Sequence, residues 1–218
     1  MGYSGKKEPK THLEHVQALV GLNLFDDARI ELSFNRLIKT DFCTKKPFEK
    51  MKDEVEFNPF SLEPQVIGQG QVLTSTVMHA ITMVRLVKIL QERKNQDQLS
   101  MLDVGCGLGY STILYADLAS QILKRPFEMC GTDFHENFIE HCHIQKDKYP
   151  VKDCNLQFIE HDFLEQTFPP VGSVWGNSFD ICTFGFEVSL DLLRAKQSTF
   201  KTDAHLIVPL SCHEFDLE

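Results

Sequence analysis

Short apolar segments alternate with segments of helical periodicity along the second half of the chain. Runs rich in β-branched and aromatic residues predict strands, while apolar positions three or four residues apart predict helices. We expect strands at 99–104, 127–132, 155–160, 179–184 and 204–210, and helices through Ile113 and Leu118, at 136–146 and at 188–196. Since such alternation produces parallel sheets covered on both faces, the sequence predicts a doubly wound, mostly parallel α/β fold.

The first part of the chain has a helical pattern of its own. Apolar residues at helical spacing predict one helix within 12–23 and a second from Ile30 to Leu37, whereas 40–66 has no sustained period and predicts a long loop. Hydroxyl residues at 74–76 can cap a further helix. We therefore expect an N-terminal helical cap and loop at 1–66, followed by one compact domain at 67–218.

A glycine-rich turn, Asp103-Val-Gly-Cys-Gly-Leu-Gly109, follows the first strand of the predicted sheet. Its glycines expose bare backbone at the carboxyl end of a central strand, where open α/β sheets bind nucleosides. Asp103 could face a cationic group through the loop amides or water. Asp133 ends the next strand and could accept hydrogen bonds from both ribose hydroxyls. A purely structural turn is the alternative, because a tight turn needs glycine whatever it binds.

The spacing Asp-x-Gly-x-Gly-x-Gly differs from the dinucleotide-binding Gly-x-Gly-x-x-Gly and resembles the motif of class I methyltransferases. The resemblance implies S-adenosyl-L-methionine as cofactor. The candidate cofactor-binding residues are Asp103, Gly105, Cys106, Gly107, Gly109, Tyr110, Asp133, Phe134, Asp162, Phe163 and His79. Asp162 could contact the adenine amino group or be an acid of a surface turn. His79 could flank the methyl donor or be an ordinary packed residue of an amphipathic helix.

Two longer stretches, Ile67–Ala80 and Met101–Tyr110, resemble protein-L-isoaspartate O-methyltransferase. The similarity runs from about Asn35 to Leu210. It implies carboxyl methylation of isoaspartyl residues in damaged proteins or peptides, which is a repair reaction. Thr74 stands where the family has the serine that holds the substrate carboxylate, and we take Thr74 and Ser75 as candidate catalytic residues. Such a reaction needs proximity and alignment rather than an acid–base pair, because the carboxylate is already ionised.

The chain departs from that family in its substrate loops and at its carboxyl end. Thr76 replaces a proline, and Phe186 and Glu187 replace small residues where they would crowd or charge the substrate mouth. The sequence ends eight residues after Leu210, short of the family's final strand pair, so a protein partner could cover that sheet edge. We therefore keep two hypotheses: a divergent, C-terminally short methyltransferase, and a catalytically inactive methyltransferase-like subunit that is an interaction module in a larger assembly.

Composition narrows the range of partners and compartments. The net charge of −9, with scattered basic residues, argues against nucleic acid as a partner. Seven cysteines without framework spacing favour free thiols in a reducing compartment, and no apolar run approaches the roughly 18 residues that span a bilayer. The histidines and cysteine at 135–143 lack zinc-site spacing, so we expect no metal. The expected location is the cytoplasm, with the mitochondrial matrix, within a complex, as the alternative.

Overall fold

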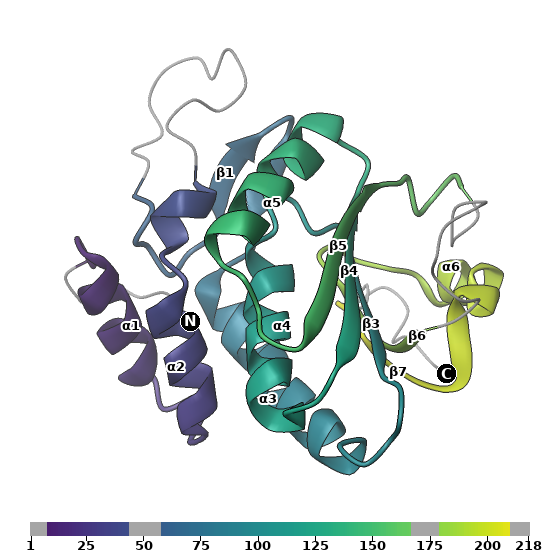
Figure 1. Ribbon diagram of the computed structural model, residues 1–218. Helices are drawn as coiled ribbons and strands as arrows, with labels where there is room; N and C mark the ends of the chain where they lie inside the picture. The colour runs from purple at the N-terminus through teal and green to yellow at the C-terminus, as the bar shows by residue number, and fades with distance from the viewer. Residues whose placement is uncertain (1–7, 44–57, 167–178, 210–218) are drawn as a thin grey trace, which may run out of the picture. The chain divides into compact units, whose positions relative to one another are not determined.

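The computed structural model describes residues 8–43, 58–166 and 179–209 (Figure 1). By its internal contacts the chain groups into an amino-terminal unit, Met1–Val84, and a carboxyl-terminal unit, Arg85–Glu218. The division falls inside helix α3 (Thr76–Glu92) rather than between residues 66 and 67. One reason is that the first turn of α3 bonds to the amino-terminal unit, where the Thr76 amide donates to the Leu62 carbonyl at 3.0 Å. Whether 1–66 and 67–218 form separate domains, as expected from the sequence, stays a prediction.

The carboxyl-terminal unit is built on a five-stranded sheet with the order β5-β4-β3-β6-β7, in which every neighbouring pair is parallel. The strands are β3 (Ser100–Val104), β4 (Phe127–Asp133), β5 (Cys154–Glu160), β6 (Phe179–Phe184) and β7 (Phe200–Ile207). The predicted parallel α/β fold is confirmed. Strand β7 begins four residues earlier than the expected Ala204, since its polar start is held by charged partners described below.

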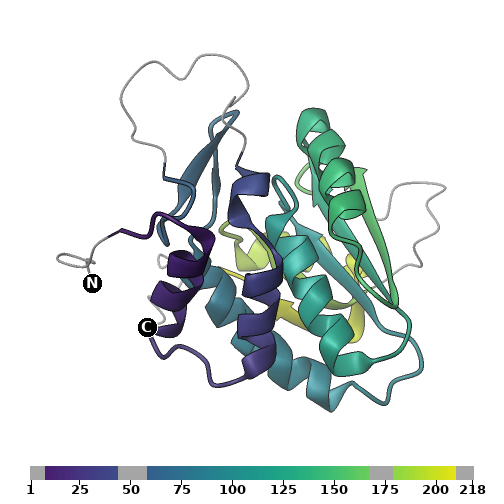
Figure 2. The same cartoon turned by 60° about the vertical axis from the view of Figure 1, so that its left-hand side comes forward.

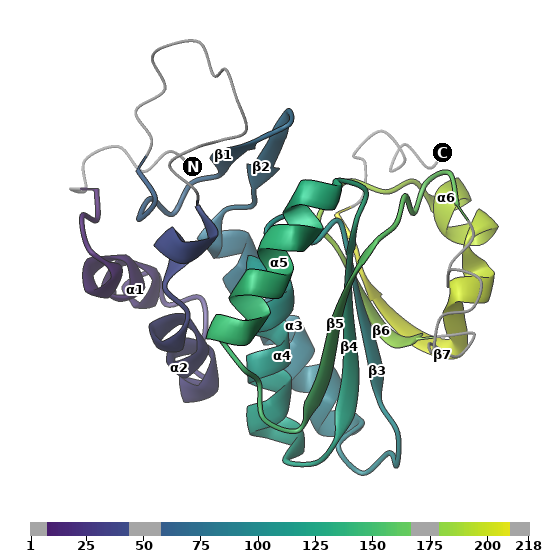
Figure 3. The same ribbon diagram turned by 45° about the horizontal axis from the view of Figure 1, so that its top comes forward.

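Helices cover both faces of this sheet. Figure 3 shows α4 (Tyr110–Leu123) and α5 (Glu136–Lys148) on one face and α6 (Leu190–Ala195) on the other. Alternate residues of β3 serve the two faces, because side chains along a strand point to opposite sides. Asp103 bonds to residues of α4, whereas Leu102 and Val104 belong to the hydrophobic cluster against which α6 packs.

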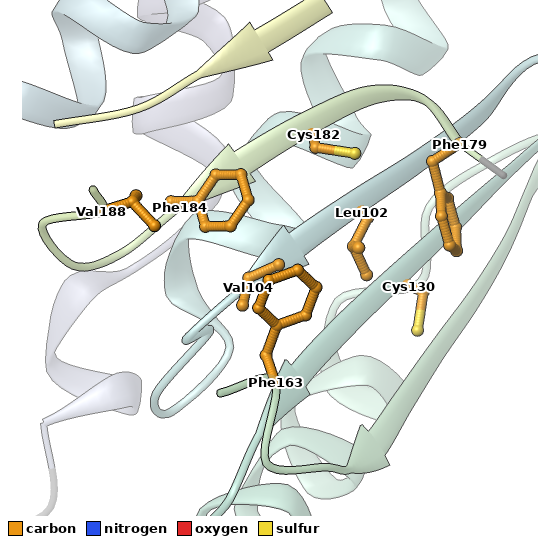
Figure 4. Packing of buried hydrophobic residues seen from close by; sticks show 8 residues of the cluster. All are labelled: Leu102, Val104, Cys130, Phe163, Phe179, Cys182, Phe184 and Val188. Carbon is orange, nitrogen blue, oxygen red and sulfur yellow. The ribbon is translucent and has the colours of Figure 1, made fainter. Parts of the chain in front are cut away.

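The core on the α6 face consists of side chains from three adjacent strands and two loops (Figure 4). Its buried members are Leu102, Val104, Cys130, Phe163, Phe179, Cys182, Phe184 and Val188. The Phe163 and Phe184 rings meet edge to face with centroids 5.6 Å apart. Such a pair contributes about 0.5–1.5 kcal/mol beyond the burial of its apolar area. Phe163, Phe184 and Val188 thus pack together near the carboxyl ends of the strands.

An ion-pair network around the fully buried Asp180 joins the amino ends of the strands. The Asp180 carboxylate, at the start of β6, accepts hydrogen bonds from the Ser100 amide at 2.8 Å, Lys201 Nζ at 2.7 Å and Gln96 Nε2 at 2.6 Å. Arg93 lies 3.4 Å from the same carboxylate. Although burial raises the pKa of Asp180, the hydrogen bonds from Lys201 and Ser100 outweigh it and hold the pKa below its usual value. Lys201 therefore belongs to a strand despite its polarity.

The amino-terminal unit contains α1 (His12–Val20) and α2 (Ala28–Arg36), which pack against each other (Figure 2). It also contains the short 3-10 helix η1 (Lys39–Phe42) and a hairpin of β1 (Gln65–Gly68) and β2 (Gln71–Leu73). The two predicted helices are confirmed, with Asp27 capping α2 through the Arg29 amide. The hairpin was not predicted. No helix in the described part of the chain has the length and apolar character that a bilayer crossing requires.

Candidate functional site

The carboxyl ends of β3 and β6 mark the point at which the strand order reverses. Strand β4 lies on one side of this adjacent pair and β7 on the other. In open α/β sheets a crevice forms outside the carboxyl ends of the strands at such a point, and ligands bind there. The loop that opens α4 follows β3, and the loop that starts at Gly185 follows β6. These two loops form the walls of the candidate site.

The glycine loop adopts a conformation that requires glycine. Gly105, Gly107 and Gly109 have φ values of +74°, +54° and +86°, which side-chain-bearing residues rarely adopt. Gly109 is also the N-cap residue directly before α4, and a Cβ atom there would lie 3.0 Å from the Cys142 Sγ atom. The predicted glycine turn between strand and helix is therefore confirmed as a structural element.

Four amides of this loop have acceptors within the protein, and one of them is that of Gly109, which donates to the Cys106 carbonyl at 2.9 Å. The amides of Gly105 and Cys106 both donate to the Thr132 carbonyl, at 2.8 and 2.9 Å. The Gly107 amide donates to the Asp133 carboxylate at 2.9 Å. The amides of Gly105, Cys106 and Gly107 therefore attach the loop to the end of β4. The contact of this loop with a cofactor stays a prediction.

Asp133 lies beside the glycine loop at the end of β4. One carboxylate oxygen accepts from the Gly107 amide and the other from the His135 amide at 3.1 Å. Each oxygen retains a second lone pair that could accept a hydrogen bond from a hydroxyl group. The residue is only 7% exposed, and burial raises its pKa against the opposing effect of these backbone amides. The structure therefore brings the predicted acid and the predicted loop together.

Asp103 has a different environment from the one expected. Its side chain is 2% exposed and accepts hydrogen bonds from the hydroxyls of Thr183 and Thr112, both at 2.6 Å, and of Ser111 at 2.7 Å. Burial raises the pKa of Asp103, and the three hydroxyl bonds oppose that rise. Asp103 thus links β3 to β6 and to the first turn of α4, and these bonds stabilise the two ends of the glycine loop. Its contact with a cationic group stays a prediction.

The other predicted cofactor residues divide into surface and core positions. Phe134 is 51% exposed, and its ring lies on that of His135 with centroids 3.9 Å apart, so an aromatic surface stands next to Asp133. Cys106 and Tyr110 are buried, and Phe163 lies in the hydrophobic cluster described above. Of these four side chains, only Phe134 offers a wide face to a ligand.

Asp162 adopts the turn role that the sequence left open as an alternative. One of its carboxylate oxygens accepts from the amides of Leu164 at 3.0 Å and Glu165 at 3.3 Å, which caps the short turn after β5. The side chain is half-buried. Since one oxygen organises this turn, the other is the atom that could meet an adenine amino group, and that contact stays a prediction.

Phe186 lies in the loop after β6, and its ring packs against the glycine loop. Its ring atoms Cδ1 and Cε1 lie 2.8 and 3.3 Å from the position that a Cβ atom on Gly105 would occupy. The Gly185 amide donates to the Val104 carbonyl at 2.8 Å, and a Cβ atom on Gly185 would collide with the Gly105 carbonyl oxygen. The two loops are therefore in contact, with the Phe186 ring covering the first glycine.

The predicted substrate residues Thr74 and Ser75, and His79, belong to the amino-terminal unit. The Ser75 hydroxyl oxygen accepts from the Met78 amide at 3.2 Å and so caps α3, while its hydrogen can still be donated. Thr74 is half-buried. His79 is buried, and this burial lowers its pKa to about 3, which keeps the imidazole neutral.

Lys39 is a buried residue of this unit that was not predicted from the sequence. Its Nζ atom donates to the Ser61 carbonyl at 2.6 Å and to the Thr76 hydroxyl at 3.2 Å. Burial lowers the pKa of Lys39 to about 8. A lysine next to an irregular segment is expected to be exposed, because lysine is rarely buried without a partner. The burial of Lys39 therefore depends on its tertiary contacts. Among the described residues, no three histidine, cysteine, aspartate or glutamate side chains gather into a metal site.

Comparison with known structures agrees with the observed fold. A Plasmodium falciparum protein assigned as a protein-L-isoaspartate O-methyltransferase, solved with S-adenosyl-L-homocysteine, has 16% identity and a TM-score of 0.65, over 93% of this chain and 85% of that chain. A second protein-L-isoaspartate O-methyltransferase has 13% identity and a TM-score of 0.57, over 92% of this chain and 55% of that one. At such identities the likeness concerns the fold.

No curated protein sequence matches the chain. A family model described as a methyltransferase domain does match it, over residues 95–208, and this segment contains all five strands of the parallel sheet up to the end of β7. The matched segment is more than half of the 218 residues. The chain therefore belongs to the methyltransferase domain family.

Proposed function

We propose that the protein binds S-adenosyl-L-methionine and methylates carboxyl groups, with isoaspartyl residues of damaged proteins or peptides as substrates. The observation that carries the cofactor assignment is the hydrogen bond between Asp133 and the Gly107 amide at 2.9 Å. It holds an acid with free lone pairs beside a glycine loop at the switch point of the sheet. The isoaspartyl assignment is supported by the sequence resemblance of Ile67–Ala80 and by the shared fold.

Three residues of the carboxyl-terminal unit would bind the nucleoside part. Asp133 would accept hydrogen bonds from the ribose hydroxyls. Hydrogen bonds to an ionised carboxylate are stronger than those to a neutral acceptor. Phe134 would supply an aromatic face for the base, because half of its surface is exposed next to Asp133. Asp162, on the next strand end, would accept from the adenine amino group.

The chemistry asks for alignment rather than for a proton transfer. The methyl donor, when bound, supplies an electrophilic methyl carbon. In the transfer, an oxygen of the ionised substrate carboxylate would form the new bond to that carbon, while the carbon–sulfur bond would break and leave its electron pair on sulfur. Thr74 and Ser75 each have a hydroxyl hydrogen that could orient such a carboxylate. Their part in the reaction stays a prediction.

Incubation with labelled S-adenosyl-L-methionine and an isoaspartyl peptide tests the proposal directly. The matched control is the same peptide with a normal aspartate, which should take up no label. Titration calorimetry with S-adenosyl-L-homocysteine, run in parallel, separates the two parts of the proposal. Binding without label in the peptide would end the isoaspartyl assignment, and absence of both would end the cofactor assignment.

A second candidate function is that of an inactive methyltransferase-like subunit in a larger assembly. The observation that favours it is the position of the Phe186 ring against Gly105, because a ring there would compete with a cofactor for the backbone of the glycine loop. Cofactor binding with no transfer to any protein acceptor would support this candidate. A protein partner at the sheet edge, the absence of a nucleic-acid partner and a cytoplasmic or mitochondrial location all stay predictions.

A further inference from the structure

The order of the strands gives the direction in which a bound nucleoside would extend. Asp133 ends β4, and Asp162 follows β5, which is the neighbour of β4 on one side. If the ribose lies at Asp133 and the base lies toward Asp162, the 5′ carbon of the ribose faces the opposite neighbour, β3. Beyond β3 lies β6. A substituent on that 5′ carbon would therefore extend along the ends of β3 and β6, where Gly105 and Gly185 stand.

Gly105 is also the residue against which the Phe186 ring lies. Two atoms of its ring lie within 3.3 Å of the position of a Cβ atom on Gly105, so the ring rests on the backbone of the first glycine. The adjacent residue leaves no room behind it, since Gly185 is packed against the Gly105 carbonyl. A group that contacts Gly105 from the crevice and the Phe186 ring would compete for one surface.

The ring is also held in position from behind. Phe186 and Phe184 meet edge to face with centroids 6.0 Å apart and an interplanar angle of 86°. Phe186 is half-buried and packs against the hydrophobic cluster that contains Val104 and Val188. Moving the ring would break the aromatic pair and expose apolar surface, and both changes oppose ligand binding.

We propose that Phe186 is a specificity-determining residue that restricts the substituent on the 5′ carbon of a bound nucleoside. A nucleoside with a short 5′ thioether binds without moving the ring, whereas one with an amino-acid tail has to displace it. This inference rests on the proposed function, and it concerns the affinity of the site for the methyl donor and for its product.

Two adenosine thioethers differ only in the group at issue. 5′-Methylthioadenosine has a methyl group on the 5′ sulfur, and S-adenosyl-L-homocysteine has the amino-acid tail. Titration calorimetry of the full chain with both ligands is the test, using the wild type, Phe186→Ala and Phe186→Leu. Leucine retains a carbon at the Cδ level, so it is the matched control that keeps most of the contact. Phe186→Val also removes both ring atoms and replaces the alanine variant if that fails to fold.

We expect the wild type to bind 5′-methylthioadenosine at least as tightly as S-adenosyl-L-homocysteine. Phe186→Ala should lower the Kd for S-adenosyl-L-homocysteine by about tenfold and change that for 5′-methylthioadenosine by less than about threefold, with Phe186→Leu close to the wild type. An unchanged or weaker affinity of Phe186→Ala for S-adenosyl-L-homocysteine would overturn the inference, because the ring would then be a binding surface. If neither ligand binds any variant, the nucleoside site itself is refuted.

Discussion

The carboxylate of Asp133 accepts a hydrogen bond from the backbone amide of Gly107 at 2.9 Å. This bond connects the end of β4 to the loop that follows the neighbouring strand β3. One acid therefore does two things: it stabilises the glycine loop, and it retains lone pairs for a ligand in the crevice beside that loop.

Replacing Asp133 by alanine should remove both ribose hydrogen bonds of the proposed site. Two charge-assisted hydrogen bonds are worth about 3 kcal/mol together, which corresponds to roughly a hundredfold increase in Kd for S-adenosyl-L-homocysteine. Calorimetric titration measures this change. Phe134→Ala is the matched control, because it removes an exposed aromatic face and should weaken binding by a smaller factor. Unchanged affinity of Asp133→Ala would show that the nucleoside binds elsewhere.

Gly109→Ala should destabilise the protein by about 1–3 kcal/mol, through a positive φ and a crowded Cβ position. The new atom would lie 3.0 Å from Cys142 Sγ and 3.3 Å from the Phe158 ring. Gly70→Ala is the control, because Gly70 also has a positive φ of +73° but has no atom within 4 Å of the new position. Urea unfolding should show a larger loss for Gly109→Ala, and equal losses would contradict the packing argument.

Asp180→Ala should lower the free energy of unfolding by about 3–5 kcal/mol, because it leaves buried cationic and amide partners without their acceptor. The side chain of Asp180 is fully buried between Arg93 and Lys201. Asp203 also pairs with Arg93, but its side chain is 74% exposed. Asp203→Ala should therefore cost less than about 1 kcal/mol. Similar losses for the two variants in chemical denaturation would refute the difference.

Acid should destabilise the amino-terminal unit through His15. Burial lowers the pKa of His15 to about 4, against the bond from its Nδ1 atom to the Phe60 carbonyl and with smaller contributions from the nearby Lys39 and His12. Since the folded pKa lies below the unfolded one, the unfolded chain takes up the proton first as pH falls below about 6.5. Stability from the neutral ring is present above that pH and is lost between pH 6.5 and 4.

The loss expected for His15 alone is about 2 kcal/mol between pH 7 and pH 5. Urea unfolding at the two pH values measures it. His15→Gln cannot titrate, so this variant should be less stable than the wild type at pH 7 but lose less stability on acidification. An identical pH dependence of the variant and the wild type would assign the effect to other groups, His79 first among them.

The apolar runs predicted the central sheet well, because strands buried on both faces need continuous hydrophobic sequence. Strands β3 and β6 agree with their expected limits within one residue. Strand β7 was placed too late because Lys201 and Asp203 look like loop residues. Their charges are matched by Asp180 and Arg93, which lie far away in the sequence. A single sequence does not show such pairings.

Turn chemistry explains why the hairpin of β1 and β2 was not predicted. Gln69 and Gly70 form a two-residue connection with φ values of +53° and +73°, which is the conformation of a type I′ turn. Asparagine or aspartate is the usual first residue of this turn, so glutamine gave a weak signal. The flanking strands have only four and three residues and little alternation.

The candidate site was predictable in its parts but not in its assembly. The glycine loop and Asp133 follow from their places after two buried strands. The three hydroxyl partners of Asp103 do not, because the one from Thr183 depends on β6 lying beside β3. Phe186 was expected to crowd the substrate mouth, which stays a prediction, whereas its position against Gly105 depends on how the two loops meet.

The bonds from the Gly105, Cys106 and Gly107 amides to Thr132 and Asp133 mean that the loop is preorganised. A ligand would find its backbone already ordered, so little conformational entropy would be lost there when a complex forms. Differences in affinity between ligands would then report on contacts and desolvation in the crevice itself. The same three amides should exchange their hydrogens slowly even when no ligand is in solution.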